Sequence, residues 1–145
     1  MDRTDTPGSR PGKFWLVSTG PGDSKYLTLQ AIEAIEKADL VLTRPEEARK
    51  VQEYLRGKRV EGPEKWDELW AHEGRPWVSE LPSFTPEERA AILKSKCRQK
   101  DEYVEELKEW MRLGKNVVIL DGGDPTVFSR FFFWLIEGFS EEEVE

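Results

Sequence analysis

The sequence predicts an α/β fold in which helices flank a mostly parallel sheet. Two apolar runs, residues 14–17 and 117–120, lack polar alternation, which is typical of strands that are buried on both faces. Each run leads into a glycine loop that carries an aspartate. A helical pattern separates the first run from a short apolar strand at 40–43, so the chain starts with a β-α-β unit. The two strands of such a unit are expected to be parallel, and the crossover that connects them is expected to be right-handed.

The first strand is expected over residues 13–19, after a polar tail over 1–12 that we expect to be disordered. A helix should follow over 28–38, because apolar residues recur there at every third position: Leu29, Ile32, Ile35 and Ala38. Pro45 suits the first turn of a second helix, and the acids Glu46 and Glu47 favour its dipole. Gly57 should end that helix, and residues 59–60 should begin a brief third strand.

The region 61–100 is expected to form a helical, tryptophan-rich insert in the lobe. It should hold a short helix over 64–71, an irregular segment, and the start of a long helix whose capping box spans residues 85–88. The long helix should run to Leu113 and end at Gly114. Its middle, 94–102, is almost wholly polar, so the helix should either protrude there or break in two. The tryptophans are expected to pack the insert onto the sheet, and the alternative is a stacking platform for a flat ligand: Trp66, Trp70 and Trp77.

The C-terminal part should contain a strand over 116–120 and a helix over 126–137 that Gly138 ends. Residues 131–136 are apolar all round, which favours an inner core helix. The alternative is a face for a second domain or a partner subunit. Val144 is expected to begin a further strand.

Composition restricts the class of protein. The chain has 145 residues, enough for one domain with its own core, and a formal net charge of -7, which makes nucleic acid an unlikely partner. No apolar run approaches the ~20 residues of a membrane helix, and the N-terminal residues do not resemble a signal peptide. Single residues His72 and Cys97 allow neither a zinc cluster nor an internal disulfide, so no metal is expected and a reducing cytoplasm fits.

The two glycine loops are the candidate functional feature. They read Gly20-Pro21-Gly22-Asp23 and Gly122-Gly123-Asp124-Pro125, and each follows a strand. Small ligands bind at the carboxyl ends of strands in open α/β sheets, so the two loops suggest one site built from two strand ends. Glycine lets the backbone approach a ligand closely, and a carboxylate beside it can hold a cation or an amine. The alternative is that Asp124 caps the next helix and that Asp23 is ordinary turn chemistry.

Nucleotide-binding motifs fit these loops poorly. A dinucleotide fingerprint would need a third glycine where Lys25 stands, and an acid where the second strand ends in Thr43 or Arg44. No Gly-Lys-Ser/Thr follows, which excludes a phosphate-binding P-loop. S-adenosylmethionine carries both a sulfonium and an ammonium group, so it suits the loops, although chemistry alone does not single it out.

Both loops and their neighbouring elements resemble the tetrapyrrole (corrin/porphyrin) methylases. The resemblance rests on residues 16–23, 26–29, 31 and 38–42, on a Gly-Lys-Arg segment at 57–59, and above all on 114–130. It implies a bilobal α/β fold with S-adenosylmethionine in the cleft between the lobes. Residues 13–145 look like the N-terminal lobe, and the C-terminal lobe is expected to be absent from this chain.

The resemblance also implies roles for individual residues. Family positions that touch the cofactor match Pro21, the backbone of residues 122–124, and Val127, and the same loops add further candidates. The full cofactor-binding set is Pro21, Gly22, Asp23, Gly122, Gly123, Asp124, Val127 and Phe128. Lys58 matches a family lysine and is the catalytic candidate, with a surface charge as its alternative. Arg130 is a candidate to bind a carboxylate of the substrate, and the alternative is that it forms an ion pair on the surface.

Some residues depart from the family pattern. In the uroporphyrinogen methylases an aspartate after the second strand is a proposed base, and Arg44 stands at that position here. Ser18 and Ser129 replace glycines that are usual in the family. These departures make the cofactor easier to assign than the substrate.

The expected function is therefore S-adenosylmethionine-dependent methyl transfer to a small molecule, with a tetrapyrrole of porphyrin or cobalamin biosynthesis as the candidate. The methyl group would pass by direct displacement, and the protein would mainly position the reactants. One alternative is a methylase of RNA ribose or of protein on the same fold. Another is a binding or regulatory module without catalysis. The isolated lobe is expected to be inactive, and the full-length form is expected to be a homodimer.

Overall fold

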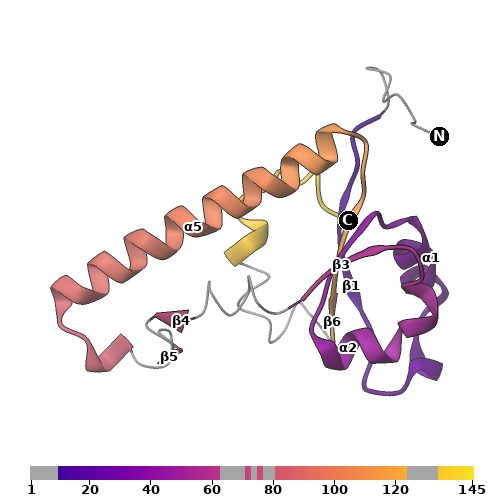
Figure 1. The fold of residues 1–145 in the computed structure, drawn as a ribbon, viewed down its shortest axis with the longest axis horizontal. Helices are drawn as coiled ribbons and strands as arrows, with labels where there is room; N and C mark the ends of the chain where they lie inside the picture. The colour runs from indigo at the N-terminus through magenta and orange to yellow at the C-terminus, as the bar shows by residue number, and fades with distance from the viewer. Residues whose placement is uncertain (1–9, 63–70, 73–74, 77–80, 124–133) are drawn as a thin grey trace.

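A parallel sheet of four strands organises the molecule (Figure 1). This computed structural model describes residues 10–62, 71–72, 75–76, 81–123 and 134–145. The strands are β1 (Phe14–Ser18), β2 (Leu40–Leu42), β3 (Arg59–Glu61) and β6 (Val117–Asp121), in the spatial order β1-β6-β2-β3. Phe14 lies opposite Val117, and Ser18 lies opposite Asp121. The predicted α/β fold with a parallel sheet is confirmed.

Helix α1 (Leu29–Lys37) connects β1 to β2. Thr28 caps it, since its hydroxyl accepts the Ala31 N–H at 3.0 Å. The predicted apolar stripe is wrong at Leu29, which is 85% exposed. An α-helix has 3.6 residues per turn, so residues spaced strictly three apart do not stay on one face. The buried face instead follows the spacing i, i+3, i+4 and i+7. The buried members of that face are Ala31, Ala34, Ile35 and Ala38.

Helix α2 (Pro45–Lys50) begins at the predicted proline, with Arg44 as its N-cap. It ends before Gly57, which was the expected stop. A single turn of 3-10 helix (Gln52–Tyr54) follows, and Gly57 adopts a left-handed φ of 75° in the turn that leads into β3.

The insert is partly different from its prediction. Ala71–His72 (β4) pairs antiparallel with Arg75–Pro76 (β5), so the expected helix over 64–71 is wrong at its last residue. Residues 63–70 and 77–80 lie outside the described residues, together with the three tryptophans of the insert. A 3-10 turn (Leu81–Ser83) then precedes the long helix.

Helix α5 (Pro86–Arg112) is one unbroken helix of 27 residues. Its predicted capping box is present: the Thr85 hydroxyl accepts the Glu88 N–H, and the Glu88 carboxylate accepts the Thr85 N–H. The polar middle does not break the helix, because Lys96 and Lys100 bury their stems on the face that carries Leu107. Figure 1 shows the N-terminal half of α5 extending beyond the sheet. Of the two expectations, a protruding helix and a broken one, the first is therefore confirmed.

Two apolar cores cover opposite faces of the sheet. Alternate strand residues point to opposite faces. The core on the α5 side contains Phe14, Leu40, Leu42, Leu107, Val117, Ile119 and Leu135. The core on the α1 side contains Val17, Ala31, Ile35, Val41, Val51, Val118 and Leu120. The central strands are therefore buried on both faces, as their lack of polar alternation predicted.

Both ends of the described chain contact the sheet. Gly12, which the predicted tail included, is buried, and its N–H donates to the Met111 carbonyl at 2.8 Å. Val144, where a further strand was predicted to begin, forms an isolated parallel bridge with Phe14. Residues 134–136 are helical within the predicted helix 126–137, and residues 124–133 lie outside the described part.

Of the helices described, none combines the length and apolar character needed to cross a membrane.

Candidate functional site

The two glycine loops meet at the carboxyl edge of the sheet. β1 and β6 are neighbouring parallel strands, so both end at this edge. Gly20 and Gly123 form an isolated antiparallel bridge, in which the Gly123 N–H donates to the Gly20 carbonyl at 3.1 Å. Their φ angles of 75° and 68° are left-handed, a conformation that glycine adopts without a steric penalty. The juxtaposition of the two strand ends agrees with the sequence prediction.

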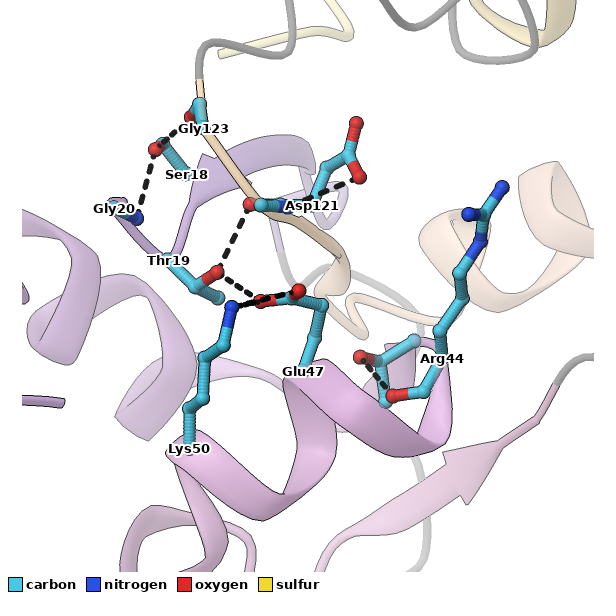
Figure 2. Close-up of polar contacts among 10 residues, drawn as sticks. Ser18, Thr19, Gly20, Arg44, Glu47, Lys50, Asp121 and Gly123 are labelled. Atoms are coloured by element: carbon cyan, nitrogen blue, oxygen red, sulfur yellow. Dashed lines mark hydrogen bonds and ion pairs between the residues drawn. The ribbon is translucent and has the colours of Figure 1, made fainter. Parts of the chain in front are cut away.

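Side chains at the end of β1 tie the loops together (Figure 2). The Ser18 hydroxyl donates to the Gly123 carbonyl and accepts the Gly20 N–H at 3.1 Å. The Thr19 N–H donates to the Asp121 carbonyl at 2.8 Å. The loops therefore form one cradle that is hydrogen-bonded through both main-chain and side-chain groups.

A carboxylate from α2 supports this cradle. Glu47, whose side chain is 12% exposed, accepts a hydrogen bond from the hydroxyl of the fully buried Thr19. Lys50 Nζ lies 2.8 Å from each carboxylate oxygen of Glu47. Figure 2 shows the Glu47 carboxylate joined by dashed lines to both the Lys50 ammonium and the Thr19 hydroxyl. The ion pair and the hydrogen bond offset the cost of burying the carboxylate.

Sequence reasoning missed this support. It assigned Glu47 only a favourable interaction with the helix dipole, and it gave Thr19 no role. The two residues are 28 positions apart and belong to no short motif. The available signal was an acid in the first turn of the helix that follows β2, a position close to the same sheet edge.

The candidate cofactor-binding residues fall into two groups. Pro21, Gly22 and Asp23 are exposed at the tip of the first loop, and Gly122 and Gly123 form the start of the second. The Asp23 carboxylate accepts the Lys25 N–H at 3.0 Å, which is the turn chemistry that was its alternative interpretation. The remaining candidates lie outside the described residues: Asp124, Val127, Phe128 and Arg130.

Lys58 is not brought to the loops. It precedes β3, so it lies at the amino edge of the parallel sheet, whereas the loops lie at the carboxyl edge. Its Nζ donates to the carbonyls of Glu36 at 2.7 Å and Ala38 at 2.9 Å, at the C-terminal end of α1. This geometry supports a helix-capping role.

Arg44 does lie at the carboxyl edge. It follows β2, and its side chain is exposed (Figure 2). A guanidinium at this edge could pair with a carboxylate of a bound molecule.

A cleft of about 430 Å³ opens beside the first loop, between β1 and α1. Its lining includes Ser18 and Gly20 from the cradle, and Trp15, Tyr26 and Lys37 around them. A volume of this size suits a small organic ligand. Within the described residues, no three His, Cys, Asp or Glu side chains gather into a group that could hold a metal ion.

Comparison with known proteins gives consistent results. The family model of the Tetrapyrrole (Corrin/Porphyrin) Methylases matches residues 13–145. The uroporphyrinogen-III C-methyltransferase of Bacillus subtilis is 31% identical over 119 residues, which cover 82% of this chain and 37% of that protein. The chloroplastic S-adenosyl-L-methionine-dependent uroporphyrinogen III methyltransferase of Arabidopsis thaliana is 32% identical over 124 residues, which cover 83% of this chain and 26% of that protein.

A solved structure with the same fold carries a ligand. It is the uroporphyrin-III C-methyl transferase from Thermus thermophilus complexed with S-adenyl homocysteine. The sequence identity is 25% and the TM-score is 0.52, and the match covers 92% of this chain and 43% of that chain. The present chain thus spans less than half the length of each of these three proteins.

Proposed function

The chain belongs to the tetrapyrrole (corrin/porphyrin) methylase family, and on this basis we propose that it is part of an S-adenosylmethionine-dependent methyltransferase. The observation that carries the proposal is the hydrogen-bonded pair of glycine loops at the carboxyl edge of the sheet. The printed name of the Arabidopsis relative and the S-adenyl homocysteine in the Thermus structure support the cofactor.

The residues present fit this cofactor. Both loops contain glycines in the left-handed conformation. Because glycine has no side chain, a ligand can contact the backbone of both loops there. The proposed binding set is the one predicted from the sequence, namely Pro21, Gly22, Asp23, Gly122, Gly123, Asp124, Val127 and Phe128. The carboxylates of Asp23 and Asp124 would face the ammonium or the sulfonium group. The bound cofactor supplies the methyl group, and the loops would hold it in register with the acceptor.

A tetrapyrrole is the proposed substrate, because both curated relatives are named for uroporphyrinogen. Uroporphyrinogen carries several carboxylates, and the exposed Arg44 at the carboxyl edge is the candidate to pair with one of them. The catalytic role predicted for Lys58 stays a prediction. Its position at the opposite edge favours a structural role instead.

A second lobe is proposed to complete the cofactor cleft. The relatives support it, since the chain matches 37% of the Bacillus protein and 43% of the Thermus chain. The chain alone would then offer one wall of the cleft and would bind the cofactor weakly. A homodimer and a cytoplasmic location are further proposals, and the latter rests on the single cysteine of the sequence.

Titration with S-adenosylhomocysteine tests the cofactor assignment. In NMR spectra of the 145-residue chain, we expect amide shifts in residues 20–23 and 122–123 at ligand concentrations near ~1 mM. Shifts confined to other parts of the chain would contradict the proposed site. Micromolar affinity of this chain would contradict the proposal that half of the cleft is missing.

Methyl transfer from labelled S-adenosylmethionine tests the substrate class. The assay uses the longest natural reading frame that contains this chain, together with extracted cell fractions. We expect label in the tetrapyrrole fraction. Incorporation only into RNA or only into protein would favour the alternative methylases on this fold, and cofactor binding without transfer to any fraction would favour a regulatory module.

A further inference from the structure

Glu47 contacts the residue that precedes the first glycine loop and the first residue of the second loop, although it belongs to neither loop. Its carboxylate accepts the Thr19 hydroxyl just before the first loop, and it also lies directly against Gly122 of the second loop. Lys50 also holds the carboxylate, through two contacts of 2.8 Å. Two different side chains therefore hold the carboxylate close to the paired loops (Figure 2).

Glu47 also occupies the space that a side chain at residue 122 would take. A Cβ atom at this position would lie 2.8 Å from Glu47 Oε1 and 3.3 Å from Glu47 Cδ. All three of its nearest atoms would belong to Glu47. The φ angle of Gly122 is not positive, so the backbone itself would accept another residue. These atoms are the end of a flexible side chain, so they restrict this position to the extent that Thr19 and Lys50 hold the carboxylate in place.

Gly123 is restricted for a different reason. Its φ of 68° is left-handed, and a Cβ atom there would meet no other atom within 4 Å. Any other residue at this position would be strained by its backbone, whatever occupies position 47. The two adjacent glycines therefore form a matched pair for substitution. Glu47 opposes a side chain at position 122, whereas the backbone conformation opposes one at position 123 regardless of Glu47.

We propose that Glu47 is a positioning residue that sets the distance of the second loop from α2 and locks it to the first loop. The cradle is then formed before the cofactor arrives, so binding does not have to order the two loops. The purpose of this arrangement rests on the proposed function, but the arrangement itself can be tested without any ligand.

Amide hydrogen exchange of the 145-residue chain, followed by NMR, is the test. The reporters are the Gly123 N–H, bonded to Gly20, and the Thr19 N–H, bonded to Asp121, and the Val118 N–H in the buried β6 strand is the reference. Glu47→Ala should raise exchange at both reporters about tenfold and leave the reference unchanged. Glu47→Gln keeps an acceptor for Thr19, so exchange should stay within about threefold of the natural chain.

A second-site comparison makes the test specific. Gly122→Ala should raise exchange at Gly123 about tenfold in the natural chain, because the new methyl group overlaps the carboxylate. In the Glu47→Ala background it should add less than about twofold. Gly123→Ala is the matched control, and its effect should be the same in both backgrounds. If Glu47→Ala does not fold, Thr19→Val serves in its place, since the carboxylate is then held by the Lys50 side chain without Thr19 and can move with it away from the methyl group.

Two results would overturn the inference. The first is an equal effect of Gly122→Ala with and without Glu47. The second is faster exchange at Val118 together with the reporters, because that pattern means general destabilisation. Absence of any amide shift with S-adenosylhomocysteine would count against the proposed function alone, and it would leave the loop measurements as they stand.

Discussion

Replacing Lys58 by Met separates a structural role from a catalytic one. Lys58 was the catalytic candidate from the sequence, yet its ammonium donates to the carbonyls of Glu36 and Ala38 at the end of α1. Met is unbranched, one atom shorter, and keeps most of the apolar stem, so the substitution removes the charge and both hydrogen bonds. We expect the variant to lose stability while the glycine loops keep their geometry.

The size of the loss follows from these contacts. A hydrogen bond with a charged partner contributes about 1.5–3 kcal/mol, and a cation at a helix C-terminus adds about 0.3–1 kcal/mol. One of the two bonds is exposed and the other is part-buried, so solvent screening reduces their sum. The expected decrease in the free energy of unfolding is about 1–2 kcal/mol. For a chain of this size it corresponds to a decrease in Tm of about 3–6 °C.

Urea unfolding followed by circular dichroism measures this change. The matched control is Lys94→Met, at an exposed lysine of α5, and its effect should stay within about 0.5 kcal/mol. The complementary assay is methyl transfer by the longest natural form at a temperature where both proteins are folded. Unchanged stability with abolished transfer would refute the structural assignment and restore Lys58 as a catalytic residue.

Three further predictions concern the rest of the fold. Leu107→Ala removes a side chain that is 1% exposed in the α5 core, and it should lower the free energy of unfolding by about 3 kcal/mol in the same urea assay. Thr85→Ala removes the N-cap of α5 and should lower it by about 1 kcal/mol, whereas Thr85→Ser should retain most of the stability. The N–H of Ser140 donates to Glu143 and holds the pKa of that carboxyl below its ordinary value of 4.5, with Lys108 adding to the effect. A lowered folded pKa stabilises the protein above the ordinary value and loses this contribution as the pH falls through the folded pKa. The stability difference between the natural chain and Glu143→Gln should therefore shrink as the pH falls below the ordinary value of 4.5 and through the lowered folded pKa, in urea titrations at each pH.

The central strands were predictable because their composition, which lacks polar residues, indicates burial on both faces. Residues 117–120 contain no polar residue, which requires apolar cover on both faces, and the two cores supply it. The boundaries of α1 were also predictable, since Thr28 and Ala38 sit at its caps. Leu29 was wrongly assigned to its buried face because a three-residue repeat was used without correcting for 3.6 residues per turn.

The site was predictable only where backbone geometry decides it. The two glycine loops had to meet, because their strands are parallel and adjacent. The contact between Thr19 and Glu47 could not be predicted, since it depends on where α2 packs relative to β1. Lys58 shows the converse, because a residue inside a recognisable segment can point to the opposite edge of the sheet.

The place of β6 in the sheet has a consequence for the synthesis of the chain. This strand lies between β1 and β2, yet about a hundred residues separate it from β1. At ribosomal rates of about 5–20 residues per second, β1 waits roughly 5–20 s for its partner. During that time the apolar strands of the nascent chain cannot close their sheet, and pairing over such a sequence separation is itself slow. Ribosome-bound chains from which residues 117–121 have not yet emerged should therefore be the ones that engage chaperones, and release from the chaperones should coincide with the emergence of these residues.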